Sequence, residues 1–251
     1  MNIQLFEKIL IRSKIFDYKY VYIYSDLRYF LLFHKKNSFK FINSFLDLFI
    51  KRNITLIIPT FSYTKEGNFY LEKTPAKLGF LPNYILKIKK GRSRSAHPLF
   101  SYVALGKNNK IVDKIGKSAF GKNSIHSRLY KNHCCYLYLG RPMILGNTMV
   151  HHIEHIFKAS YRYNKIFPTK VYSLNQYIGK NYSAYVRKDI DNPDFFVNFS
   201  KVYKKIKNEH FIFNYGDPKK FSNITIHPYD IFYEKLKQLY TKDRNIFINK
   251  I

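Results

Sequence analysis

The stretch from Thr148 to His155, Thr-Met-Val-His-His-Ile-Glu-His, contains the residues best suited to chemistry. On a helix His151 and Glu154 are three positions apart, so their side chains share a face and can hydrogen-bond. A carboxylate beside an imidazole fixes the tautomer of the ring and raises its basicity, as a general base requires. The alternative is a surface helix with chance histidines, since the chain has nine His in 251 residues.

The same residues allow a second interpretation. His151-x-x-Glu154-His155 fits the inverted zinc-protease pattern H-x-x-E-H, in which two His ligands lie one helical turn apart. This pattern is short and needs a third ligand, which the sequence does not mark. We therefore expect no metal.

A second polar cluster is basic and runs from Lys87 to Ser101. It reads Lys-Ile-Lys-Lys-Gly-Arg-Ser-Arg-Ser-Ala-His-Pro-Leu-Phe-Ser. Arginine donors, serine hydroxyls and turn amides together make a good anion site. A solvated basic loop is the alternative interpretation.

Alternating strands and helices must position these clusters. Tyr18–Tyr24 and the apolar run Ile54–Ile58 read as strands, and Ser38 can cap a helix between them whose buried face has helical spacing. Continuous apolar runs suit strands covered on both faces, as in a parallel sheet. Further elements are expected at Leu78–Lys90 (helix), Phe100–Leu105 (strand), Tyr136–Leu139 (strand) and from the cap Thr148 to about Ala159 (helix). The His–Glu pair would then lie at the carboxyl end of a strand, where open α/β sheets bind ligands.

The pattern changes after about Phe167. Val171–Phe199 alternates loosely, as antiparallel strands do, and Val202–Asn208 and Tyr229–Tyr240 read as helices. The predicted fold is therefore α/β, with a central, mostly parallel sheet flanked by helices and a smaller C-terminal region that contains antiparallel strands. We assign residues 1–167 to the core and residues 168–251 to a region that packs on it and is a candidate for acceptor binding.

Composition limits the function classes. There are 44 Lys+Arg and 16 Asp+Glu, a formal charge of 44 − 16 = +28, and 23 Tyr and 23 Phe argue against disorder. The apolar stretches are too short for membrane spans, and Glu7, Lys8 and Arg12 interrupt any signal segment. Cys134 and Cys135 are adjacent and read as buried thiols, so a reducing, cytoplasmic location is expected. The charge favours anionic partners.

Several short motifs, taken in order, resemble the aminoglycoside 3-N-acetyltransferase family, also called the antibiotic N-acetyltransferase family. The resemblance covers roughly residues 20–167. It rests on Tyr24-Ser25-Asp26-Leu27, Ile58-Pro59-Thr60-Phe61-Ser62-Tyr63, Leu78-Gly79-Phe80-Leu81, Arg94-Ser95-x-His97-Pro98-x-x-Ser101, Phe120-Gly121-x-x-Ser124, Leu137-Tyr138-Leu139-Gly140, Thr148-x-x-His151-x-x-Glu154 and Tyr161-Arg162-Tyr163.

The resemblance implies an α/β fold distinct from the GNAT acetyltransferases, with acetyl-CoA or another acyl-CoA as co-substrate and an amino-sugar amine as acceptor. By this likeness His151 is the general base, Glu154 orients it, and Thr148 lies beside the thioester. Coenzyme A would be held by the turn Ser25, Asp26 and Leu27 and by Arg94, Ser95, His97 and Ser101.

Departures from the family pattern bear on the acceptor. Asn83 stands where the family usually has Glu, and Ile125 where it has Pro. A protein at +28 repels polycationic aminoglycosides at long range, so a nucleotide-linked amino sugar for surface polysaccharide synthesis is the expected acceptor. The alternative is an aminoglycoside, and thus antibiotic resistance. A basic nucleic-acid-binding domain is a distant alternative; no RNA-binding signature or helix-turn-helix pattern appears, and we expect no nucleic-acid partner.

Overall fold

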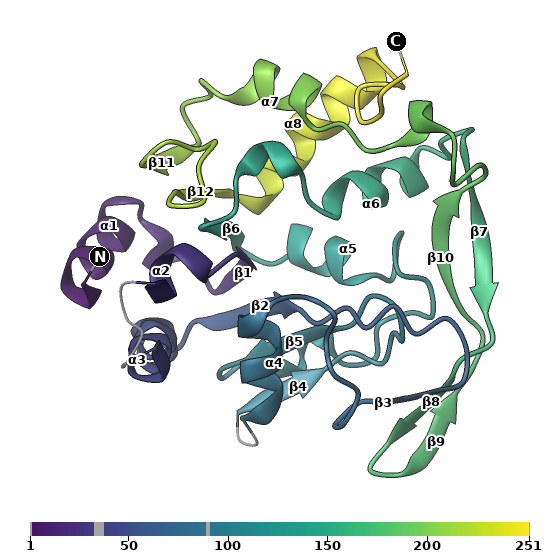
Figure 1. Ribbon diagram of the computed structural model, residues 1–251, viewed down its shortest axis with the longest axis horizontal. Helices are drawn as coiled ribbons and strands as arrows, with labels where there is room; N and C mark the ends of the chain where they lie inside the picture. Colours follow the sequence, from purple (N-terminus) through teal and green to yellow (C-terminus); the bar gives the residue numbers. More distant parts are fainter. Residues whose placement is uncertain (1, 33–37, 89–90, 251) are drawn as a thin grey trace.

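A mixed sheet of seven strands forms the centre of the computed structural model, which describes residues 2–32, 38–88 and 91–250 (Figure 1). The strand order is β11-β12-β6-β1-β2-β5-β4. The strands are β1 (Tyr20–Ser25), β2 (Thr55–Pro59), β4 (Arg92–Arg94), β5 (Tyr102–Leu105), β6 (Cys134–Leu139), β11 (Phe213–Tyr215) and β12 (Ile224–Pro228).

The sheet is parallel only at its centre, where β1 pairs with both β2 and β6. The pairs β2–β5, β4–β5, β6–β12 and β11–β12 are antiparallel. The predicted α/β class is confirmed, but the prediction of a mostly parallel sheet is wrong. The prediction failed because an antiparallel strand that is covered on both faces is as continuously apolar as a parallel one. The apolar run of β5 therefore does not indicate in which direction the strand pairs.

Helices cover both faces of the sheet, so neighbouring side chains of one strand enter different hydrophobic clusters. On β1, Val21 and Ile23 join the cluster that contains α1 (Ile3–Arg12), α3 (Ser38–Ile50) and α4 (Phe80–Lys87), together with Phe30 of α2 (Arg28–Leu32). Tyr20 and Tyr22 join the other cluster, with α5 (Ile125–Tyr130), α6 (Met149–Ile156), α7 (Ser200–Ile206) and α8 (Tyr229–Lys242). This double coverage explains the unbroken apolar runs. The last predicted residues of the helix Leu78–Lys90, 89 and 90, lie outside the described residues.

Smaller strand groups lie beside the main sheet. The antiparallel pair β7 (Arg162–Phe167) and β10 (Tyr182–Arg187) forms a ribbon at the right edge of Figure 1. Strand β8 (Lys170–Ser173) pairs antiparallel with β9 (Gln176–Gly179) and parallel with β3 (Asn68–Tyr70). The region 168–251 also supplies β11 and β12 to the main sheet, so the two regions share one sheet.

Cys134 and Cys135 lie on β6, buried and unpaired, as predicted. Burial raises the pKa of the Cys135 thiol, so it stays protonated at neutral pH. Within the described residues, the structure contains no helix both long and apolar enough to cross a membrane.

Arg94 is an interior anchor and not a surface anion site. Its side chain is 6% exposed, and its guanidinium donates to the carbonyl oxygens of Thr60, Leu71 and Thr74 and to the Ser101 hydroxyl. The guanidinium carbon also lies 4.8 Å from the centroid of the Phe69 ring. These contacts tie separate loops of the chain together and use four of the five N–H groups of the Arg94 side chain.

Ser95, His97 and Ser101 are buried in the same way. Ser95 Oγ accepts the main-chain N–H of Tyr102, and Ser101 Oγ donates to the Thr60 carbonyl. His97 Nδ1 accepts two main-chain N–H groups and its Nε2 lies 3.0 Å from the Ser183 carbonyl. The polar atoms of Arg94, Ser95, His97 and Ser101 are thus engaged within the protein itself, and the expectation that these residues hold coenzyme A stays a prediction.

Gly140, directly after β6, allows the turn that follows β1 to pack against this strand end. Its φ is +67°, and a Cβ there would lie 2.2 Å from the Asp26 carbonyl oxygen. We expect Gly140→Ala to lower the free energy of unfolding by more than about 3 kcal/mol, measured by denaturant titration. Gly67→Ala is the matched control, because Gly67 has a φ of +72° with nothing within 4 Å. It should lose only the backbone cost of about 1–2 kcal/mol; equal losses would contradict the steric argument.

Arg94→Lys tests the interior role of Arg94. One ammonium cannot reach the three carbonyls that the guanidinium fork spans, so we expect the free energy of unfolding to fall by about 2–4 kcal/mol. Arg92→Lys on the same strand is the control and should change stability little. The measurement is thermal unfolding of both variants. Unchanged stability of Arg94→Lys with weakened coenzyme A binding would restore the original prediction.

Candidate active site

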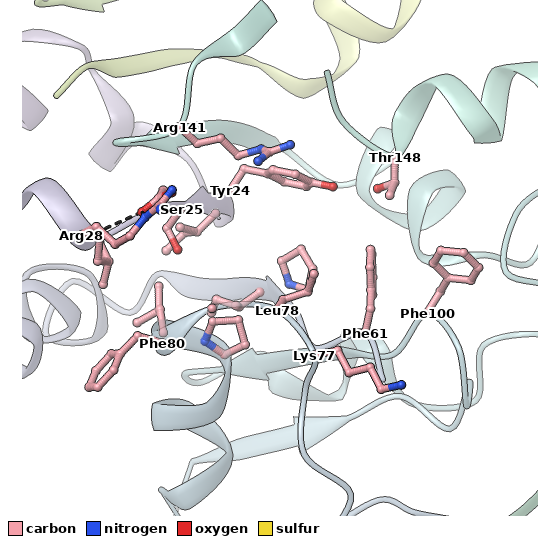
Figure 2. A pocket seen from close by; sticks show the side chains of 18 of the residues that line it. Tyr24, Ser25, Arg28, Phe61, Lys77, Leu78, Phe80, Phe100, Arg141 and Thr148 are labelled. Carbon is pink, nitrogen blue, oxygen red and sulfur yellow. Dashed lines mark hydrogen bonds and ion pairs between the residues drawn. The ribbon is translucent and has the colours of Figure 1, made fainter. Parts of the chain in front are cut away.

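A cleft of about 670 Å³ opens where the parallel strands end. It is lined by the turn after β1, the end of β2, the loop before α4, Arg141 beyond β6, and Thr148 and His151 at the start of α6 (Figure 2). The carboxyl ends of parallel strands meet at one edge of a sheet, which is where the sequence predicted the His–Glu pair to lie.

The turn Ser25, Asp26 and Leu27, which was predicted to hold coenzyme A, lines this cleft. Asp26 is fixed by Arg28, whose guanidinium lies 2.5 Å from its carboxylate and whose main-chain N–H donates to the same group at 3.1 Å. Hydrogen bonding to Arg28 holds the pKa of Asp26 below its ordinary value. This carboxylate therefore enters the cleft already paired.

Helix α6 begins at Met149, directly after the predicted cap residue Thr148. Thr148 makes no capping hydrogen bond; the Asn147 side chain instead accepts the main-chain N–H of Met149 at 2.9 Å. The Thr148 hydroxyl is consequently available to other groups, and the oxygen of Tyr22 lies 3.4 Å from it. Thr148 and His151 both line the cleft, about one helical turn apart.

His151 and Glu154 form the contact that their spacing predicts. The Nδ1 of His151 lies 2.7 Å from Oε2 of Glu154, with the histidine side chain 23% exposed and the glutamate 0%. Because an ionised carboxylate can only accept, Nδ1 is the protonated nitrogen of the neutral ring. Nε2 then keeps its lone pair, as a general base toward the cleft requires.

Glu154 is held by two further groups. The Tyr161 hydroxyl donates to its Oε1 at 2.8 Å, and the Nε of Arg162 forms an ion pair with its Oε2 at 2.9 Å. Burial favours the neutral acid, but His151, Arg162 and Tyr161 together hold the pKa of Glu154 below its ordinary value. The carboxylate stays charged in the interior because a histidine, a tyrosine hydroxyl and an arginine all lie against it.

The pKa of His151 is lowered, first by burial and then by the positive charge of Arg162. Glu154 acts in the opposite direction and raises the pKa, but not enough to reverse the shift. Arg162 thus compensates the carboxylate that would otherwise favour the imidazolium. His151 is neutral, and able to accept a proton, at pH 7.

The neighbouring histidines have structural contacts. His152 Nδ1 accepts the main-chain N–H of Gly121 at 3.1 Å, and burial lowers the pKa of this histidine to about 3. The ring of His155 packs so closely on Gly121 that a Cβ there, at φ +93°, would lie 2.6 Å from its Cε1. The Phe-Gly-x-x-Ser turn therefore packs against α6 and supports it. The Phe120 ring also packs edge-on against the ring of His151, with the two ring centroids 5.7 Å apart.

The zinc pattern gains no third partner. Nδ1 of His151 is occupied by Glu154, and His155 is turned toward Gly121 and the ring of Tyr185. In the described part of the chain, no group of three or more His, Cys, Asp or Glu side chains is placed to hold a metal ion.

Sequence reasoning missed Arg141, Lys77 and the role of Asn83. Arg141 and Lys77 line the cleft, but in the sequence each lies outside the basic run Lys87–Ser101. Asn83, which stands where the family usually has Glu, uses its amide as both donor and acceptor with the main chain of Ala76 and donates to the Gly79 carbonyl. It therefore fixes the loop that carries Lys77 and Leu78. A carboxylate could not donate these hydrogen bonds. The Asn in place of the usual Glu was therefore the one indication in the sequence that this side chain has a structural role.

Solved structures share this fold. Sisomicin-bound AAC-VIa is 12% identical with a TM-score of 0.75, covering 96% of this chain and 98% of its own. AAC-IIIb, binary with CoASH, is 13% identical with a TM-score of 0.74 and covers 96% and 97%. The apoenzyme of aminoglycoside acetyltransferase AAC(3)-IVa is 15% identical with a TM-score of 0.70 and covers 98% and 90%. No curated protein matches the sequence.

Identities this low show only the fold, whereas a match to a family model shows the family. The model described as aminoglycoside 3-N-acetyltransferase matches residues 33–214, well over half of the chain. The predicted resemblance is therefore confirmed, and with it membership of a family of N-acetyltransferases. The chain belongs to the aminoglycoside 3-N-acetyltransferase family.

Proposed function

We propose that this protein transfers the acetyl group of acetyl-CoA to an amine of an aminoglycoside, with His151 as the general base. The observation that carries the proposal is the His151–Glu154 pair at 2.7 Å on the wall of the cleft. Glu154 orients the ring, and Tyr161 and Arg162 hold Glu154.

The reaction follows from this arrangement. The amine nitrogen attacks the thioester carbon, and His151 Nε2 takes the proton that the nitrogen must lose. The C–N bond forms, the C–S bond breaks, and the proton passes from His151 to the leaving thiolate, so the products are the amide and free coenzyme A. The Thr148 hydroxyl, one helical turn from His151 on the cleft wall, is our candidate donor to the reacting thioester.

The charge of the cleft suits the coenzyme. Its described lining contains Arg28, Lys77 and Arg141 against one carboxylate, Asp26, a balance of 3 − 1 = +2. Coenzyme A carries its negative charge on phosphates, which such a cleft attracts. The turn Ser25–Leu27 is proposed as part of the coenzyme site, whereas Arg94, Ser95, His97 and Ser101 are not.

The acceptor expected from the sequence is revised. A nucleotide-linked amino sugar was inferred from the net charge of +28, but nothing in the family match supports that acceptor or a role in surface polysaccharide synthesis. The aminoglycoside alternative has the better support, because the family bears that name and sisomicin is bound in a similar structure. Net charge is a global quantity, and here the cations of the cleft serve the donor.

The direct test is thiol release from acetyl-CoA with a panel of acceptors. Sisomicin, gentamicin and apramycin represent aminoglycosides, and uridine-diphosphate amino sugars represent the nucleotide-linked class. We expect release with at least one aminoglycoside and none with the nucleotide sugars. Release with nucleotide sugars alone would overturn the acceptor assignment, and no release with any amine would overturn the transferase mechanism.

His151→Gln should lower kcat by a factor on the order of 10² to 10⁴, because the amine loses its proton acceptor. Thermal unfolding should change little, since the ring is partly exposed. His155→Gln, on the same helix but turned away from the cleft, is the matched control and should keep most of the activity. The measurement is steady-state kinetics at saturating substrates; equal losses in both variants would remove His151 from the role of base.

The pH dependence of kcat/KM for acetyl-CoA should report His151. Activity is present while the ring is neutral and is lost as the pH falls through its pKa, which burial and Arg162 hold below 6.5. Arg162→Gln removes the positive charge that disfavours the imidazolium, so the acid limb should move to higher pH. Glu154→Gln removes the negative charge that favours it, so the limb should move to lower pH. Shifts in the same direction for both variants would contradict this electrostatic account.

A further inference from the structure

Arg141 carries a buried polar atom that the protein does not satisfy. Its Nε has no hydrogen-bond partner in the structure although it is removed from solvent. Its guanidinium carbon lies 5.3 Å from the centroid of the Tyr24 ring, and the residue lines the cleft. Figure 2 shows the guanidinium beside this ring, with the loop of Leu78 and Lys77 across the cleft. Buried donors of this kind are rare without a partner, so the missing partner is expected from a ligand.

The position of Arg141 is firmly set. It follows Gly140, whose close approach to the Asp26 carbonyl locks the strand end against the turn after β1. Asp26 donates its main-chain N–H to the Leu139 carbonyl at 2.9 Å, which ties the same two segments together. Pro142 comes next and restricts the backbone further. The guanidinium thus enters the cleft from a fixed backbone, with one face covered by an aromatic ring.

The other cations of the cleft differ from Arg141. Arg28 is committed to Asp26, which it contacts through Nε and a terminal nitrogen. Lys77 is exposed to solvent. Among the described residues, no carboxylate forms an ion pair with Arg141. Arg141 is therefore a partly buried cation of the cleft whose charge can be neutralised by a ligand.

Resting on the proposed function, we propose that Arg141 binds a phosphate of coenzyme A and thereby selects the full coenzyme over its phosphate-free fragments. A guanidinium offers forked donors that fit phosphate oxygens, and its weak hydration suits a half-buried site. Arg141 lies in none of the motifs on which the family resemblance rests, so this contact is assigned from the geometry of the chain itself. Arg141 is a donor-binding residue, and the chemistry remains with His151.

The test compares Arg141→Gln with the unmodified protein on acetyl donors of decreasing phosphate content: acetyl-CoA, its 3′-dephospho form, acetyl-4′-phosphopantetheine and acetyl-pantetheine. We expect KM for acetyl-CoA to rise roughly 10- to 100-fold, the effect of losing one charge-assisted hydrogen bond, with kcat nearly unchanged. Acetyl-pantetheine should be used equally well by both proteins. The donor at which the difference disappears identifies the phosphate: the 3′-phosphate if it vanishes with the 3′-dephospho form, the diphosphate if it persists there.

Two controls complete the design. Arg244→Gln removes another arginine that lies over aromatic rings, 4.7 Å from the Phe157 centroid, but outside the cleft, and should leave every KM unchanged. Circular dichroism and thermal unfolding of Arg141→Gln show whether the variant is folded, and coenzyme A titration by calorimetry gives its affinity without turnover. If Arg141→Gln loses equally on acetyl-pantetheine, or retains its affinity for coenzyme A, the proposal is wrong. If the unmodified protein releases no thiol from any donor but binds coenzyme A through Arg141, the proposed function fails and this inference stands.

Discussion

The buried carboxylate of Glu154 is the interaction on which the site depends. A charged group with 0% side-chain exposure is tolerable only when its lone pairs are matched, and here His151, Tyr161 and Arg162 match them. Arg162 is the first residue of β7 and Tyr161 immediately precedes it, so the ribbon β7–β10 is tied to the helix that carries the base. Arg162 also balances the carboxylate electrically, which keeps the histidine neutral and basic instead of permanently protonated.

The candidate base was predictable because both members of the pair lie on one helix. Helical geometry alone brings positions 151 and 154 together, so no tertiary information was needed. Arg94 shows the opposite case. A run of arginines and serines has the same sequence whether it faces solvent or the interior. Which of the two occurs is decided by the loops that supply its carbonyl partners, 20 to 34 residues away in the sequence. The motif thus pointed to Arg94, but it could not show that the guanidinium hydrogen-bonds inside the protein.

The same distinction separates what was foreseen of the fold from what was not. Apolar runs located β1, β2, β5 and β6 within two residues or so, because burial leaves its mark locally. Strand direction is set by partners distant in sequence, as when Ile224 of β12 lies opposite Leu139 of β6 and runs against it. Nothing in the residues of either strand encodes that choice. The prediction therefore extended the parallel pairing of the three central strands, β2, β1 and β6, to most of the sheet.

The charge of the chain teaches a related lesson. With 16 acidic residues for 44 basic ones, most arginines cannot find carboxylates. Arg128 donates to the carbonyls of Ile111 and Lys114, and Arg244 lies over Phe157. Arg94 donates to three main-chain carbonyls and one hydroxyl. Several guanidinium groups are thus stabilised by neutral carbonyl oxygens and aromatic rings in place of carboxylates. Net charge therefore says little about the acceptor, whereas the unpartnered Nε of Arg141 beside Tyr24 is a local observation on which a donor contact can be proposed.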